Sequence, residues 1–239
     1  ISDNPRNLSH FFRQNFSQVT NPPIDSLRET RVMSLKTRFS NLGNILDDGA
    51  TQEGVMVFDS PIMTNNGWNV LKRHFRSQVA EIDCTFDVAG GPEALRAAIA
   101  RVRSEAEIAV RSGKSQLFLT DENQSATRAG ITMILATAGV HTHLVRKGLR
   151  TFASINVRSA EALDTHYFAV LIGVGATTVN AYLAQEAIAD RHSRGLFGKL
   201  SYDECVQRYK KAIEDGLLKI MAKTVSYTHL RAHETGRNL

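Results

Sequence analysis

The sequence predicts an α/β fold built from parallel strand–helix units. From residue 78 onward, short alternating or apolar stretches typical of strands are followed by longer stretches with apolar residues every three or four positions, which are typical of helices. Glycines stand where several of these helices should end. The connections between successive strands are long enough for crossover helices, so the pattern indicates parallel strands with right-handed connections.

Four such units follow one another along the chain. The expected strands are 79–88, 116–119, 151–157 and 176–180. The expected helices are one that opens at Gly90 and is stopped by Gly113, followed by 131–147, 160–172 and 181–190. Four units make half of an eight-fold barrel or most of an open, doubly wound sheet. Periodicity alone does not choose between these two arrangements.

The flanking segments have their own signals. We expect an amphipathic helix at 7–16, a turn at 20–24 that contains two prolines, a helix capped by Asp25 or Ser26, a polar loop at 43–54 and a strand at 55–58. A further helix is expected at 202–220, because its apolar residues form one stripe.

The composition is that of an ordinary folded chain. Its 239 residues include 42% apolar side chains and 29 basic against 24 acidic residues without a basic block, which disfavours disorder and nucleic-acid binding. The cysteines, Cys84 and Cys205, are too far apart for a zinc motif built on a cysteine pair. No apolar run approaches the roughly 20 residues of a membrane span, and no signal-type segment opens the chain. We expect a cytoplasmic protein with no membrane or nucleic-acid partner.

Both ends of the sequence look cut. The chain opens at Ile1 without a methionine, inside what reads as folded sequence. Residues 225–239 show no apolar period and resemble the translation of a sequencing adapter. We expect 225–239 to be a non-native tail that plays no part in the fold.

Few side chains are arranged for chemistry. His141 and His143 are two positions apart on an expected helix, so they point in different directions; we expect one to face the core and one the solvent, without a metal. Asp121 and Glu122 follow an expected strand at the end where parallel sheets bind ligands. They could serve as a base or a ligand, but without a partner we favour a polar loop. Cys84 alternates with apolar residues and is expected to be a small core residue.

No complete active-site motif is found in the sequence. Gly173 and Gly175 precede an expected strand instead of following one, so they do not form a phosphate cradle, and Gly173 is expected to end a helix. His166 is expected to be a packed or surface histidine. There is no nucleophile elbow, dinucleotide fingerprint or P-loop. From the residues alone, this is an α/β domain without a self-sufficient active site.

Several long stretches resemble one family. Residues 11–29, with their proline pair, and 32–35 are similar to the opening of the central domain of the large chain of glutamate synthase. Further stretches resemble the same domain in the same order: 60–65, 119–121, 140–150, 166–173, 179–184 and 209–221. The resemblance covers essentially residues 1–224. Two departures are Ala181, where the family usually has proline, and Thr142, where histidine is common.

The resemblance implies the function of a larger enzyme. Glutamate synthases make two glutamates from glutamine and 2-oxoglutarate, assimilating ammonia. An upstream amidotransferase domain releases the ammonia, and a downstream (β/α)8 domain carries FMN and an iron–sulfur cluster. Electrons come from a small NADPH-linked subunit or from ferredoxin. Neither catalytic centre is expected in this chain, so we expect no catalytic, cofactor-binding or metal-binding residue here.

The resemblance also implies a division of the chain. Residues 1–192 would be the central domain, a degenerate half-barrel of βα units that links the two catalytic domains. Residues 193–224 would be a connector and the lead-in helix of the FMN-binding barrel, and the tail 225–239 would follow.

An ammonia tunnel is the one function expected of particular residues. Such a tunnel needs apolar walls with a few hydroxyl or carbonyl acceptors and little water. Met33, Ser34, Thr64 and Asn65 supply that mixture in two of the matching stretches. Met33 and Thr64 could equally serve only to pack or to cap a helix.

Two other classes of function compete with this interpretation. One is a stand-alone structural or interaction module of the same fold with no catalytic partner. The other is an independent (β/α) enzyme that binds flavin, which would need a phosphate-binding glycine turn after a late strand.

Overall fold

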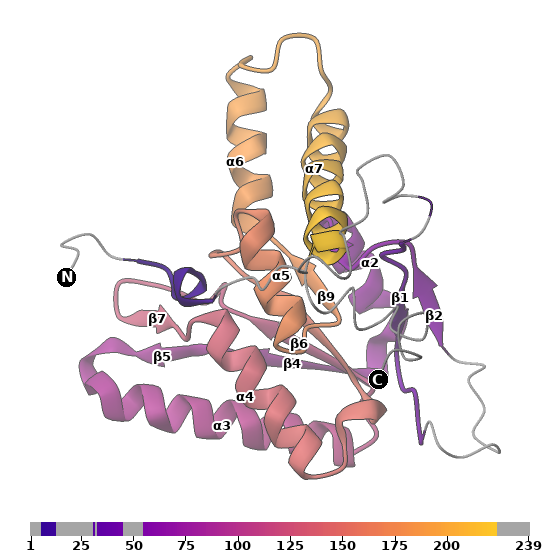
Figure 1. Cartoon of the computed structure of the whole chain (residues 1–239). Coiled ribbons are helices and arrows are strands. Elements are labelled where there is room, and N and C mark those ends of the chain that lie inside the picture. Colours follow the sequence, from indigo (N-terminus) through magenta and orange to yellow (C-terminus); the bar gives the residue numbers. More distant parts are fainter. Residues whose placement is uncertain (1–5, 13–30, 32, 45–54, 224–239) are drawn as a thin grey trace.

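The centre of the molecule is a five-stranded parallel sheet with helices on both faces (Figure 1). The computed structural model describes residues 6–12, 31, 33–44 and 55–223. In spatial order, the strands are β3 (Ile62–Met63), β9 (Thr178–Asn180), β8 (Ser154–Arg158), β6 (Gln116–Thr120) and β4 (Val79–Asp83). The predicted α/β class with parallel strand–helix units is confirmed.

The units after residue 78 lie side by side in chain order. β4 pairs with β6, β6 with β8, and β8 with β9. The intervening helices α3 (Gly91–Arg111), α4 (Met133–Arg146) and α5 (Thr165–Gly173) all contribute to one apolar core with the sheet. In a doubly wound sheet the strand order reverses and helices cover both faces. Here the order does not reverse among these four strands.

The segment before residue 78 covers the other face. β3 precedes β4 in the chain but pairs with β9 at the opposite edge, so the connection between β3 and β4 must cross the whole sheet. Its helix α2 (Asn65–Phe75) packs Trp68 against Phe118 of β6, with ring centroids 4.5 Å apart. Neither β3 nor α2 was predicted from the sequence.

A small hairpin extends this second core. β1 (Thr37–Phe39) and β2 (Met56–Phe58) pair antiparallel. Phe39 is fully buried and its ring lies 5.2 Å from that of Phe58 and 5.4 Å from that of Phe75. The hairpin and α2 therefore enclose a separate aromatic cluster on the face away from α3, α4 and α5.

The two faces of the sheet differ in chemistry. Side chains that face α3, α4 and α5 are apolar: Ile82, Leu117, Leu119, Ile155, Val157 and Val179. Alternate positions on the other face are mostly polar: Gln116, Thr120, Ser154, Asn156, Arg158, Thr178 and Asn180. Asn156 Nδ2 donates to Gln116 Oε1 (3.1 Å), and Thr178 Oγ1 donates to Asn156 Oδ1 (2.7 Å). We call these three fully buried residues the polar ladder.

Most helix ends follow the sequence signals. α3 ends just before Gly113 (φ 85°) and α4 just before Gly148 (φ 68°), as predicted. The third helix begins at Thr165 instead of 160, because the Asp164 side chain accepts the Tyr167 N–H (2.8 Å) and caps the helix there.

The sequence predicts one strand over 79–88, and this prediction is wrong, because the structure has two strands there. The Cys84 N–H donates to Thr120 O (2.8 Å) and Cys84 O accepts the Ile131 N–H (2.7 Å), so the chain leaves the parallel ladder at this residue. Beyond it, β5 (Thr85–Asp87) pairs antiparallel with β7 (Arg128–Gly130) in a separate two-stranded sheet.

The N-terminal predictions are only partly covered. Over 7–12, the expected helix 7–16 is a single 3₁₀ turn, η1 (Leu8–Phe11). The turn at 20–24, the cap at 25–26, most of the loop 43–54 and the tail 225–239 lie outside the described residues. The remaining 3₁₀ turns are η2 (Arg76–Gln78), η3 (Val88–Gly90) and η4 (Arg150–Phe152).

The last two helices form a hairpin that projects from the body (Figure 1). They are α6 (Tyr182–Ser193) and α7 (Tyr202–Lys223), close to the predicted bounds. Ile213 and Leu217 of α7 belong to the main core. α7 approaches α5 closely at Gly216, where an added Cβ would lie 2.6 Å from Thr165 Cγ2. In the described part of the chain, no helix has the length and apolar character needed to cross a membrane.

We expect Gly175→Ala to destabilise the chain strongly. Gly175 has φ 116°, and an added Cβ would lie 2.3 Å from His141 Nδ1. Strain alone costs about 1 to 3 kcal/mol, and the steric overlap adds to it. The control is Gly173→Ala at the end of α5, where, beyond its chain neighbours and the backbone of its own helix, no atom of the described residues lies within 4 Å of the added Cβ. It should be neutral or slightly stabilising in urea denaturation. Equal midpoints for the two variants would contradict this account.

Candidate functional site

Polar residues gather where the parallel strands end. Asp83, Asp121, Arg158, Asn180 and Thr64 stand at or directly after the ends of β4, β6, β8, β9 and β3, respectively. All five strands run in the same direction, so these ends lie along one edge of the sheet. We call this the carboxyl edge. It is the edge at which open α/β sheets bind ligands.

Asp121 joins two loops at the middle of this edge. Its side chain is buried, and the Ala160 N–H lies 3.1 and 3.0 Å from its two carboxylate oxygens. Burial raises the pKa of Asp121 to about 6, and the charge of Glu161 adds to the effect. The carboxylate therefore fastens the loop after β6 to the loop after β8.

Glu161 extends the network towards the helices. Glu161 Oε2 accepts the Met133 N–H at the start of α4 (3.2 Å) and the hydroxyl of the fully buried Tyr167 in α5. Burial and the bond to Glu161 raise the pKa of Tyr167. This carboxylate thus ties α4 and α5 to the carboxyl edge.

Arg158 is the buried cation of the edge. One terminal nitrogen pairs with Glu122 Oε1 at 2.8 Å, and the guanidinium lies over the rings of Trp68 (5.8 Å) and Tyr182 (5.2 Å). The Arg158 side chain is 11% exposed, so both rings help to keep the guanidinium from water, whereas the Glu122 side chain is 37% exposed. Glu122, which we predicted to be in a polar loop, is the partner of this cation.

Amide side chains join β9 to β3. Asn180 Nδ2 donates to Met63 O and to Asn65 Oδ1, both at 3.0 Å. Gln185 Oε1 accepts the Asn65 N–H (2.8 Å), while Gln185 Nε2 lies 3.4 Å from Met63 O. These bonds fix the start of α2 relative to α6.

Two of the four predicted tunnel residues lie at this edge. Thr64 is half-buried, and its Oγ1 accepts the Gly67 N–H (3.0 Å) and caps α2. Asn65 is half-buried and follows directly. Ser34 is exposed, with Oγ accepting the Lys36 N–H (3.1 Å), and Met33 is half-buried. Among the described residues, no hydrogen bond brings Ser34 to Thr64 or Asn65.

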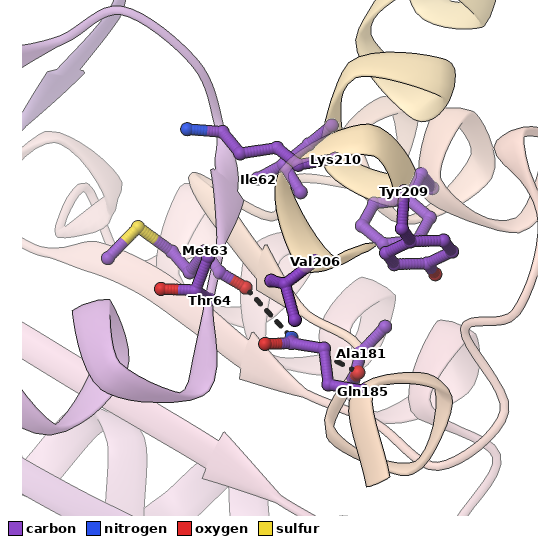
Figure 2. Close-up of a pocket in the computed structure, with 9 residues that line it drawn as sticks. Ile62, Met63, Thr64, Ala181, Gln185, Val206, Tyr209 and Lys210 are labelled. Atoms are coloured by element: carbon purple, nitrogen blue, oxygen red, sulfur yellow. Dashed lines mark hydrogen bonds between the residues drawn. The ribbon is translucent and has the colours of Figure 1, made fainter. Parts of the chain in front are cut away.

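A narrow crevice adjoins Thr64. Its walls come from β3, α5, α6 and α7, and Figure 2 shows Met63 of β3 and the following Thr64 across from Val206 and Tyr209 of α7. The full lining is Ile62, Met63, Thr64, Phe168, Ala181, Gln185, Val206, Tyr209 and Lys210. The crevice is too narrow in this conformation to hold a water molecule. Sequence reasoning missed Gln185 and the α7 residues, because only the fold brings them to β3.

His141 and His143 bind different partners and do not share a metal site. His141 Nδ1 accepts a hydrogen bond from Arg150 Nε (3.0 Å), and His143 Nε2 lies 2.6 Å from Glu107 Oε2. Both are half-buried, so the prediction of one core and one solvent histidine is wrong. His166 Nε2 lies 2.8 Å from Ser9 O, as expected of a packed histidine. In the described ranges, no three His, Cys, Asp or Glu residues are grouped so that they could hold a metal ion.

Cys84 is a core residue, as predicted. It is fully buried, and burial raises the pKa of its thiol to about 12, so it is not a nucleophile at neutral pH. Gly173 is the last residue of α5, which confirms its role at a helix end.

The fold and the carboxyl edge define an α/β domain whose polar side chains mainly hold loops and helices together. The glutamate synthase central domain model matches residues 1–229. The chain belongs to this family.

Named relatives agree with the family. Over 223 residues, the chain is 63% identical to the NADPH glutamate synthase large chain of Azospirillum brasilense, covering 93% of this chain and 15% of that protein. It is 35% identical to the NADH glutamate synthase of Saccharomyces cerevisiae, covering 93% of this chain and 11% of the yeast protein. It is 37% identical to the ferredoxin-dependent glutamate synthase of Pyropia yezoensis, covering 93% of this chain and 15% of that protein. The chain thus spans a small part of each relative.

Asp121→Asn should remove a pH dependence of stability. Folding raises the pKa of this carboxyl from 3.8 to about 6, so its stabilising contribution is present below pH 3.8 and lost as the pH rises through about 6. The free energy of unfolding of the wild type, minus that of the variant, should fall by about 2 to 3 kcal/mol over that interval.

Urea denaturation at several pH values measures this difference. Asp190→Asn, on the exposed side of α6, is the control for the loss of one carboxylate and should show no such fall. A difference that stays constant or rises with pH would contradict the burial of an ionisable Asp121.

Proposed function

We propose that this chain is the central part of a glutamate synthase, which converts glutamine and 2-oxoglutarate into two molecules of glutamate. The observation that carries the proposal is the family match over residues 1–229, supported by 63% identity to a bacterial large chain. In this role the chain links an upstream glutamine amidotransferase domain to a downstream FMN domain of the same polypeptide, and it is inactive by itself.

The cofactors of the whole enzyme belong to other parts of it. An iron–sulfur cluster is held by about four cysteine thiolates, whereas this chain has two cysteines, both buried and far apart in the sequence. The residues present therefore do not fit a cluster. We place FMN in the downstream domain as well.

The electron donor is a further part of the proposal. The relatives' names include NADPH, NADH and ferredoxin, and the 63% identical relative is the NADPH form. We therefore favour a small NADPH-linked subunit over ferredoxin as the partner that supplies electrons.

The domain division is proposed at residue 192. Residues 1–192 form a half-barrel-like central domain, an assignment supported by the unreversed order of β4, β6, β8 and β9. Residues 193–224 form the connector and the lead-in helix α7 of the FMN-binding barrel. The boundary coincides with the end of α6 at Ser193.

The crevice beside Thr64 supports the proposal that this part of the chain lines a passage for ammonia. Its lining is mainly apolar, and the lining residues with polar side chains are Thr64, Gln185, Tyr209 and Lys210 (Figure 2). Neutral ammonia needs walls of this kind, because water would protonate it, and the crevice would widen to let it pass. We propose Thr64 and Asn65 as wall residues and keep Met33 and Ser34 as candidates for the wall near the amidotransferase domain.

A chimeric enzyme tests the main proposal. Residues 1–224 of this chain would replace the matching segment of the Azospirillum brasilense large chain. The two sequences are 63% identical over 223 residues. We expect glutamine- and 2-oxoglutarate-dependent NADPH oxidation within about tenfold of the parent, because buried contacts between close relatives are largely interchangeable.

The controls separate misfolding from a wrong assignment. The chimera must elute like the parent in gel filtration and retain its FMN absorbance. A folded, flavin-loaded chimera without activity would contradict the proposal and favour the stand-alone structural module.

Thr64→Trp in the active chimera tests the passage. The larger side chain should prevent the crevice from widening to admit ammonia, so that glutamine hydrolysis exceeds glutamate formation by severalfold. Thr64→Ser keeps the hydroxyl that caps α2 and should leave the ratio unchanged. Glutaminase and glutamate-forming rates are measured on the same sample, and an unchanged ratio in Thr64→Trp would exclude Thr64 from the wall.

A further inference from the structure

Within the described residues, two buried polar atoms at the carboxyl edge have no hydrogen-bond partner. They are Arg158 Nε, a donor, and Asn180 Oδ1, an acceptor. Buried polar atoms in folded proteins nearly always have a partner, and an unmet one costs about 1 to 3 kcal/mol. Each of these two atoms therefore needs a hydrogen-bond partner that the described side chains do not supply.

The two side chains are neighbours. Arg158 of β8 and Asn180 of β9 are directly paired in the register of the parallel sheet. Both side chains lie on the polar face, and adjacent strands are about 4.8 Å apart. The residue with the unused donor and the residue with the unused acceptor are thus neighbours in the sheet.

Their other contacts prevent both groups from turning away. Asn180 Nδ2 donates to Met63 O and Asn65 Oδ1, so a flipped amide would set its oxygen against two acceptors. Arg158 is held by Glu122 and by the rings of Trp68 and Tyr182.

Burial limits what could bind between them. Asn180 is fully buried and Arg158 is 9% exposed, which leaves no path for a large ligand. An ammonium ion has no lone pair with which to accept from Nε–H, and the guanidinium would repel it. A small neutral molecule with both a lone pair and a proton to donate meets both needs.

We propose that Arg158 Nε and Asn180 Oδ1 together bind one small neutral molecule that accepts one hydrogen bond and donates another. In the isolated chain this molecule is water. The same site accepts neutral ammonia, because ammonia has the same donor and acceptor capacity. Only this second part rests on the proposed passage, which Met63 and Ala181 line next to Asn180 (Figure 2).

The first test is a crystal structure of the 239-residue chain that resolves ordered water, grown without ammonium or amines. We expect one isolated density peak within hydrogen-bond distance of both atoms. A direct bond between Arg158 and Asn180, or no peak, would overturn the proposal. If crystals do not form, a nuclear Overhauser effect from the Asn180 side-chain NH₂ to a long-lived water is the equivalent readout.

A soak with methylamine tests whether the site binds a neutral amine as well as water. A second crystal is soaked in methylamine at a pH above the pKa of methylammonium. Density for an additional atom at the peak supports binding of neutral amines. An unchanged single peak overturns the ammonia part, and this result does not depend on whether Thr64 lines a passage.

A pair of substitutions checks which atom holds the molecule. Arg158→Lys keeps the positive charge beside Glu122 but removes Nε, so the peak should be lost or move away from Asn180. Arg128→Lys is the matched control, because Arg128 Nε donates to Thr85 Oγ1 (2.9 Å) in the separate β5–β7 sheet. The peak should be unchanged in the control, and an unchanged peak in Arg158→Lys would contradict the assignment.

Discussion

The polar ladder is the constraint on which the rest of the fold depends. Gln116, Asn156 and Thr178 are fully buried, and two hydrogen bonds join their side chains across three strands. Such groups lose stability if they are left without partners, so the ladder specifies the register of β6, β8 and β9. It also makes one sheet face unsuitable for the helices of the strand–helix units. That face is instead covered by the aromatic side chains of α2 and the β1–β2 hairpin.

The register of β6, β8 and β9 determines which charged residues meet at the carboxyl edge. With the strands held in place, Asp121 meets the backbone of the next loop, and Arg158 meets Glu122 across the strand ends. Most of these charged groups are thus paired with other groups of the carboxyl edge.

The sequence was most informative where local signals were strong. The helices that end before Gly113 and Gly148 and the apolar strand 116–119 were predicted close to their observed bounds. α2 was missed because its stretch is mostly polar and its apolar residues are separated along the chain. The break at Cys84 could not be predicted, because it depends on hydrogen bonds to Thr120 and Ile131, which are distant in sequence.

The candidate site was predictable only in part. Thr64 and Asn65 could be named from a matching stretch, and Asp121 and Glu122 from their place after a strand. Their partners Ala160, Gln185 and Arg158 lie 39, 120 and 36 residues away from Asp121, Asn65 and Glu122, respectively. No local pattern links such distant residues, so strand order and register were needed to bring them together.

The packing of α7 on α5 bears on the order in which the protein can fold. Ile213 and Leu217 complete the main core, and Gly216 lets the two helices touch. Both apolar residues lie near the end of the described chain, so during synthesis this core stays incomplete until residue 217 has left the ribosome. Folding of the sheet and its helices therefore depends on a segment that is made last.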